Sequence, residues 1–181
     1  MAVDALNPYE PLSQQLHNFV VVGMDNVGST LAYINKTREI PMMALYAMIR
    51  SAIEARSFGL WLSHAGTKNK QAWVGIRLSY RNNEDLGSLE SVWAASSAEE
   101  FPALDAVRKK LVAYQQGIPN YRTHDITGSP KITQIVKEAD SAIQSRFYFT
   151  GIQAWKACNA MAHAHFPVQR VVFTARLTTK N

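Results

Sequence analysis

Three polar side chains near the end of the sequence have the types and spacing that acid–base chemistry on a phosphate requires. Lys156, Asn159 and His163 are separated by steps of three and four residues, so in a helix they lie on one face. An imidazole accepts a proton from an attacking hydroxyl near neutral pH, and a fixed cation stabilises negative charge that develops on phosphorus. Neither role needs a metal ion. The same spacing fits a simpler interpretation, in which Lys156 is solvated and the other two side chains are hydrogen-bonded packing groups.

The charge distribution favours an anionic ligand at the same place. All 14 Asp and Glu residues precede residue 141, so residues 141–181 carry the whole net charge of +5. His165 adds a second imidazole to this acid-free segment and is a candidate for binding phosphate. The basic excess of the chain is modest, however, and a solvating surface explains it equally well.

Three charged residues earlier in the chain are candidates for the same site. Arg50 and Glu54 are one helical turn apart in a strongly apolar segment, where an unpaired charge would be costly, and an internal ion pair is the simpler interpretation. In the functional interpretation, Glu54 orients His163 through its second ring nitrogen, and Arg50 or Arg77 holds a phosphate.

Metal and cofactor sites are not expected. His163 and His165 are two positions apart, which turns a helix by about 200°, so both cannot hold one ion within a helix. Cys158 is the single cysteine and is expected in the core. The sequence contains no P-loop, Rossmann glycine pattern, nucleophile elbow or zincin motif.

Apolar periodicity predicts the helices that must position these side chains. We expect a single domain over residues 1–181, an all-α irregular bundle of about five or six helices with a short extended C-terminal arm at residues 169–178. Gly23 and Gly28 predict close helix packing in the first helix, and the apolar second helix is expected to be central. A loop is expected at residues 119–130. The expected helices cover residues 12–36, 41–64, 68–82 with an extension to 93, 99–116, 131–140, and 141 or 144 to 164.

The composition indicates a cytoplasmic protein that does not enter a membrane. The N-terminus has no basic segment followed by a long apolar stretch, and Arg50, Glu54 and Arg56 interrupt the most apolar window. One cysteine fits a reducing compartment. The chain ends soon after the helix that carries His163, which also fits a piece of a longer protein.

Three short motifs resemble uncharacterised bacterial members of the HEPN-like helical superfamily, over about residues 41–167. They are Arg50-Ser-Ala-Ile-Glu54-Ala-Arg-Ser-Phe-Gly-Leu-Trp61-Leu, Arg77-Leu-Ser-Tyr-Arg81 and Trp155-Lys-Ala-Cys-Asn-Ala-Met-Ala-His163-Ala. HEPN domains are small helical bundles, and many are metal-independent ribonucleases of toxin–antitoxin and phage-defence systems. Their motif is an arginine followed, after four to six residues, by a histidine.

The resemblance implies an RNA-binding protein with metal-independent ribonuclease activity. Lys156 takes the arginine position and His163 the histidine position, but lysine lacks the planar fork that suits phosphate, and Asn159 does not directly follow the cation. A non-catalytic interaction or nucleotide-binding module is therefore the alternative. The resemblance also implies a homodimer, with apolar contacts such as Trp155, Met161 or Phe166, and an antitoxin partner.

Overall fold

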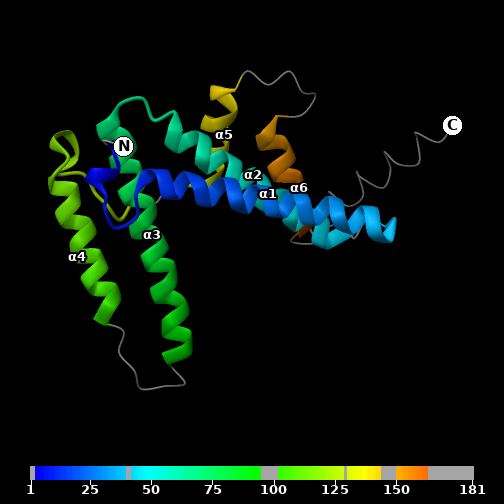
Figure 1. The fold of residues 1–181 in the computed structure, drawn as a ribbon, viewed down its shortest axis with the longest axis horizontal. Helices are drawn as coiled ribbons and strands as arrows, with labels where there is room; N and C mark the ends of the chain where they lie inside the picture. The colour runs from blue at the N-terminus through cyan, green and yellow to red at the C-terminus, as the bar shows by residue number, and fades with distance from the viewer. Residues whose placement is uncertain (1–2, 40–41, 95–101, 129, 144–149, 163–181) are drawn as a thin grey trace. The chain divides into compact units, whose positions relative to one another are not determined.

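The computed structural model of the chain describes residues 3–39, 42–94, 102–128, 130–143 and 150–162, and all regular structure in these ranges is helical (Figure 1). The predicted all-α fold is therefore confirmed for this part of the chain. The expected C-terminal arm lies outside the described residues. The helices are α1 (Leu12–Thr37), α2 (Met42–Ser63), α3 (Lys68–Ala94), α4 (Pro102–Gln116), α5 (Ile132–Ala142) and α6 (Gly151–Ala162), with short 3-10 helices at Asp4–Leu6 and Pro119–Tyr121.

Where the predicted bounds fall within the described ranges, they agree with the structure to within two residues, except at the start of the last helix. The predicted starts at residues 41 and 99 and the predicted end at residue 164 lie outside the described residues. The predicted start at residue 141 or 144 is wrong, because Ser141 belongs to α5 and α6 begins at Gly151. A capping box fixes this start: the Thr150 N–H donates to Gln153 Oε1 at 3.0 Å, and the Gln153 N–H donates to Thr150 Oγ1 at 3.3 Å. The Thr-x-x-Gln pattern was readable in the sequence.

Contacts divide the chain, expected from its length to be one domain, into two compact units. The first comprises Met1–His17 and Leu62–Lys131, and the second comprises Asn18–Trp61 and Ile132–Asn181. The boundary passes through α1 and near the end of α2.

The first unit is built around α3, which packs side by side with α4 (Figure 1). Its core includes the fully buried side chains of Ile76, Leu111 and Ile118. Close approach of α3 and α4 uses a glycine, since a Cβ at Gly87 would lie 3.3 Å from the Leu104 side chain. The burial of these apolar groups supplies the main driving force for this packing.

Two glutamines organise the rest of the first unit. Gln15, at the start of α1, donates from Nε2 to the Gly75 carbonyl at 3.2 Å and to Ser79 Oγ at 3.1 Å, which ties α1 to α3. Gln115 donates from Nε2 to the carbonyl oxygens of Tyr121 and His124, both at 2.7 Å. The predicted loop at residues 119–130 is therefore held to α4 through its backbone.

The second unit begins with α1 packed on α2. Phe19 stacks on Phe58 with ring centroids 5.2 Å apart, and a Cβ at Gly23 would lie 3.8 Å from the Ala55 side chain. The predicted close packing is confirmed at Gly23. It is wrong at Gly28, where an added Cβ meets nothing within 4 Å.

The remaining helices of this unit are joined by polar contacts. The Asp140 carboxylate of α5 accepts a hydrogen bond of 2.7 Å from the backbone N–H of Ile152 in the first turn of α6, which satisfies one of the donors at that helix end. The Trp61 indole of α2 donates to Glu138 of α5 at 2.8 Å. These contacts tie α5 to α2 and to α6, and the buried side chains of Ile135, Val136 and Met161 add apolar packing in the same unit.

Candidate functional site

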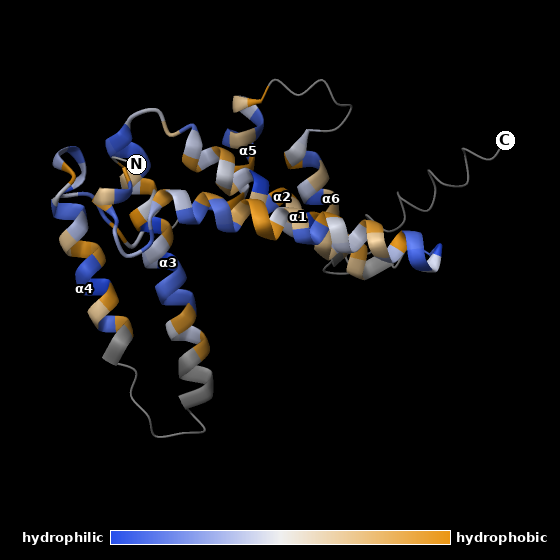
Figure 2. Ribbon diagram, viewed as in Figure 1, coloured by the Kyte–Doolittle hydropathy of each residue, from blue (hydrophilic) through white to orange (hydrophobic). Residues whose placement is uncertain are grey.

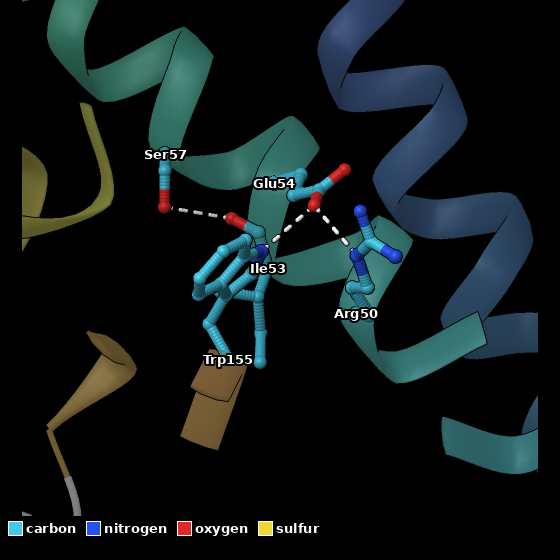
Figure 3. A network of polar contacts seen from close by, with 5 residues as sticks. All are labelled: Arg50, Ile53, Glu54, Ser57 and Trp155. Carbon is cyan, nitrogen blue, oxygen red and sulfur yellow. Dashed lines mark hydrogen bonds and ion pairs between the residues drawn. The ribbon is translucent and has the colours of Figure 1, made fainter. Parts of the chain in front are cut away.

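Glu54 is the centre of a polar network that links α2 to α6 (Figure 3). Its Oε1 atom accepts a hydrogen bond of 2.8 Å from Arg50 Nε and one of 2.7 Å from the Trp155 indole nitrogen. The Arg50 guanidinium lies over the Trp155 ring at 5.9 Å from its centroid, a cation–π distance. One carboxylate oxygen therefore positions both a cation and an aromatic ring.

The predicted ion pair between Arg50 and Glu54 is confirmed. The two side chains are 27% and 21% exposed, so the pair is partly solvated and pays less desolvation than a fully buried one. The Ser57 hydroxyl donates to the Ile53 carbonyl one turn earlier at 2.7 Å and takes no part in the ion pair (Figure 3).

Glu54 retains an acceptor for a further partner. Among the described residues, Arg50 and Trp155 both donate to Oε1, and no donor reaches the second oxygen, Oε2. A carboxylate accepts several hydrogen bonds at once, so holding Arg50 and Trp155 leaves it able to orient an imidazole.

Lys156 and Asn159 lie beside this network on α6. The packed side of α6 carries the buried side chains of Cys158 and Met161 together with the Trp155 contact, while Lys156 is exposed and Asn159 is half-buried. Within the described residues, Lys156 makes no ion pair and the Asn159 amide makes no hydrogen bond. A cation and an amide are thus free to meet a ligand, and α6 itself contains no acid.

His163 and His165, the expected general base and a phosphate-binding residue, lie outside the described residues. Their roles remain predictions from the sequence. Phe166, an expected dimer contact, also lies outside the described part of the chain.

Arg77 belongs to the first unit, whereas Arg50, Glu54, Lys156 and Asn159 belong to the second. Its guanidinium lies 5.6 Å from the centroid of the Trp73 ring. Burial lowers the pKa of Arg77, and the charge of Asp125 opposes this effect. Its Nε is buried and has no hydrogen-bond partner among the described residues. Its contacts therefore tie it to the first unit, and its role in holding phosphate stays a prediction.

Cys158 is a core residue, as predicted. Its side chain is buried, and desolvation raises the pKa of the thiol, which disfavours the reactive thiolate. No cluster of three or more His, Cys, Asp or Glu side chains in the described ranges is placed to hold a metal ion.

Trp155 is the site residue whose role the sequence analysis missed, because it was assigned only an apolar contact. A signal was present: Arg50 and Glu54 needed partners, and a partly buried indole N–H needs an acceptor. In the structure, Glu54 accepts hydrogen bonds from both the Trp155 indole and Arg50.

Searches against protein-family models, curated proteins and solved structures gave no match to this chain. A membrane span was also sought, and none of the described helices combines the length and apolar content that crossing a bilayer requires.

Proposed function

We propose that this protein is a HEPN-like RNA-binding protein and that its second unit holds the RNA phosphate backbone along α6. One observation carries the proposal: Lys156, which is exposed and forms no ion pair with any residue the structure describes, lies beside the Asn159 amide, next to an arginine that Glu54 holds on the Trp155 ring. Cations and amides are the usual protein partners of phosphate oxygens.

We infer a polymer such as RNA, and not a small anion, as the ligand. A single exposed lysine supplies little affinity, but a polymer brings successive phosphates to several cations at once, and binding gains from released counterions. The acid-free sequence from residue 141 onward removes carboxylates that would oppose this contact. Trp155 is partly exposed, and a tryptophan ring is the kind of aromatic group on which unpaired bases stack.

Metal-independent cleavage is the activity that this site would support. In the proposed reaction, His163 removes the proton from a ribose 2′-hydroxyl, and the resulting oxygen attacks the adjacent phosphorus as the bond to the 5′-oxygen breaks. The products are a 2′,3′-cyclic phosphate and a 5′-hydroxyl, whose oxygen takes its proton from water. Lys156 neutralises charge on the phosphate, and Oε2 of Glu54 holds the imidazole in the tautomer that accepts the proton. Toxin–antitoxin or phage defence is the setting that the HEPN resemblance suggests, with an antitoxin as partner.

The test is incubation of the purified protein with total RNA and transfer RNA in EDTA, beside a His163→Ala variant. The proposal expects RNA to be retained by both proteins and cleaved only by the wild type. Equal cleavage by both would assign the activity to a contaminant. Retention without cleavage would remove the catalytic part, and absence of both would remove the proposal.

A non-catalytic interaction module is the second candidate. One specific observation favours it: α1 exposes several large apolar side chains, among them Val20, Met24 and Leu31, and exposed apolar surface is typical of protein-binding sites. The same RNA-retention assay separates the two functions, since a module of this kind would not retain RNA.

A further inference from the structure

Arg77, on α3, is a cation that the first unit holds in place without pairing it. Its guanidinium lies 5.6 Å from the centroid of the buried Trp73 ring. It forms no hydrogen bond or ion pair with any residue that the structure describes, and its Nε atom is buried. A guanidinium carries five N–H donors, and a buried donor without an acceptor costs free energy. Arg77 therefore needs an acceptor that the described part of the chain does not provide.

Asp125, in the loop that follows α4, has an acceptor that its own neighbours leave unused. The Thr127 N–H and hydroxyl both donate to Oδ1, at 2.9 and 2.7 Å. No donor among the described residues reaches the second oxygen, Oδ2. The loop is hydrophilic along most of its length (Figure 2), and the Asp125 side chain is exposed. The Asp125 carboxylate is therefore open to a ligand.

Gly128 lies where the side chains of Arg77 and Asp125 approach each other. The position that a Cβ on Gly128 would take is 3.5 Å from Arg77 Nη2 and 3.5 Å from Asp125 Oδ2, so these two atoms are at most twice that distance apart. Both side chains belong to the described residues, and they do not form an ion pair. A donor and an acceptor thus face one space beside a residue without a side chain. Two hydrogen bonds of about 2.9 Å to neighbouring atoms of one planar ligand span a gap of this size.

Both groups keep their positions through contacts of their own. Arg77 lies on Trp73, and the two hydrogen bonds from Thr127 hold the Asp125 carboxylate. A cation and a carboxylate side by side have little net charge, and Asp125 would repel a phosphate bound to Arg77. The sequence predicted a phosphate at Arg77, but a neutral group that presents an acceptor beside a donor suits this pair better.

We propose that Arg77 and Asp125 bind the edge of an unpaired guanine base of RNA, which extends the proposed RNA binding and rests on it. Every base has an acceptor beside a donor on its edge, but guanine adds a second acceptor, N7, next to O6. Arginine donates to these two atoms through two of its N–H groups. The guanine N1–H, on the other side of O6, then donates to Asp125 Oδ2.

The test of the site uses nucleosides, because they carry the base without a phosphate. Isotope-labelled protein is titrated with guanosine, adenosine and 7-deazaguanosine, in which a carbon replaces N7, and amide shifts are followed by NMR. We expect guanosine to shift amides of residues 119–128 and to bind at least about fivefold more tightly than the other two. Equal affinities for the three nucleosides, or shifts confined to other segments, would overturn the proposal.

Three variants separate recognition of the base from stability of the fold. Arg77→Lys keeps the charge but loses the planar fork, so guanosine and 7-deazaguanosine should bind it equally. Gly128 has no positive φ, so Gly128→Ala fits the backbone, and its methyl group near Arg77 and Asp125 should weaken guanosine binding at least about fivefold. Arg81→Lys, one turn later on α3 and paired with Asp85, is the control and should change the affinity less than about twofold.

Circular dichroism verifies that the three variants fold. A preference for guanosine over 7-deazaguanosine that persists in Arg77→Lys would overturn the role of Arg77. Guanosine affinity that falls equally in Arg77→Lys and Arg81→Lys would overturn it as well.

Two further comparisons identify where the base comes from. An octamer of uridines with one central guanosine should bind at least about tenfold more tightly than GMP, because it brings several phosphates with the base. Equal affinities would assign the site to a free nucleotide and overturn RNA as the source. N-acetylglycinamide presents a peptide acceptor and donor, and binding as tight as that of guanosine would overturn the proposal in favour of a protein partner. RNA retention without a guanosine preference overturns only this inference, whereas guanosine binding without RNA retention overturns the proposed function and, with it, RNA as the source of the base.

Discussion

Removing the Glu54 carboxylate should destabilise the second unit mainly through Trp155. The Glu54→Ala change leaves the Trp155 indole N–H, which donates at 2.7 Å, without its charged acceptor. A hydrogen bond to a charged group contributes about 1.5 kcal/mol when the carboxylate is partly solvated. The Arg50 pair adds only about 0.3 kcal/mol, because it is a partly exposed i,i+4 pair in the less favourable order, with the cation preceding the acid. We expect a total loss of about 2 kcal/mol.

A second tryptophan–glutamate hydrogen bond in the same unit supplies the control. Trp61 donates to Glu138 at 2.8 Å, nearly the same distance, but this contact is exposed to solvent. Water replaces an exposed acceptor at little cost, so Glu138→Ala should cost about 0.5 kcal/mol. The difference between the two variants isolates the effect of burial at nearly constant geometry.

The assay is urea unfolding followed by far-UV circular dichroism, run as two double-mutant cycles. Glu54→Ala is combined with Trp155→Phe, and Glu138→Ala with Trp61→Phe, so that loss of ring volume cancels within each cycle. We expect a coupling energy of about 1–1.5 kcal/mol for the Glu54 pair and about 0.3 kcal/mol for the Glu138 pair. Coupling energies that are equal, or both near zero, would refute the reasoning that partial burial makes this network stabilising.

Two further predictions concern stability. Gly28 lies in the middle of α1 with nothing near an added Cβ, so Gly28→Ala should raise the free energy of unfolding by about 0.5–1 kcal/mol. Gly66 has a φ of 85°, so Gly66→Ala should lower the free energy of unfolding by about 1 kcal/mol. Urea unfolding at low protein concentration checks the sign of both changes. Hydrogen bonds from the Thr127 hydroxyl and N–H lower the pKa of Asp125 in the folded protein. The ionised Asp125 therefore stabilises the fold at a pH above its pKa in the unfolded chain, and this stabilisation is lost as the pH falls through its lower pKa in the folded protein. The difference in urea midpoint between wild type and Asp125→Asn should therefore shrink as the pH falls below about 4. A difference that stays constant with pH would contradict the role given to the Asp125 carboxylate.

The sequence predicted helices well because their apolar periodicity and end signals are local. Pro11, which precedes α1, and Gly66, which follows α2, are such signals. The predicted start of α6 is wrong because apolar residues continue across residues 141–150, whereas the capping box of Thr150 and Gln153 begins the helix at Gly151. The local end signal decides this boundary.

The site was predictable only in part, because its contacts join residues far apart in the chain. The Arg50–Glu54 pair is a one-turn spacing and could be inferred from the sequence. Its link to Trp155 depends on how α6 approaches α2, which no local pattern encodes. The exposure of large apolar side chains on α1, such as Val20 and Met24, was likewise hidden, since apolar periodicity predicts an apolar face and not whether anything covers it.

The salt dependence of RNA affinity tests the proposed function most directly. Lys156→Ala is compared with Lys137→Ala, because both lysines are exposed on helices of the second unit, and only Lys156 lies beside the Glu54 network. For single-stranded RNA, losing one phosphate contact should reduce the slope of log affinity against log salt by about 0.7. We expect that reduction for Lys156→Ala and an unchanged slope for Lys137→Ala. Identical slopes for the wild type and both variants would show that Lys156 contacts no phosphate and would contradict the account.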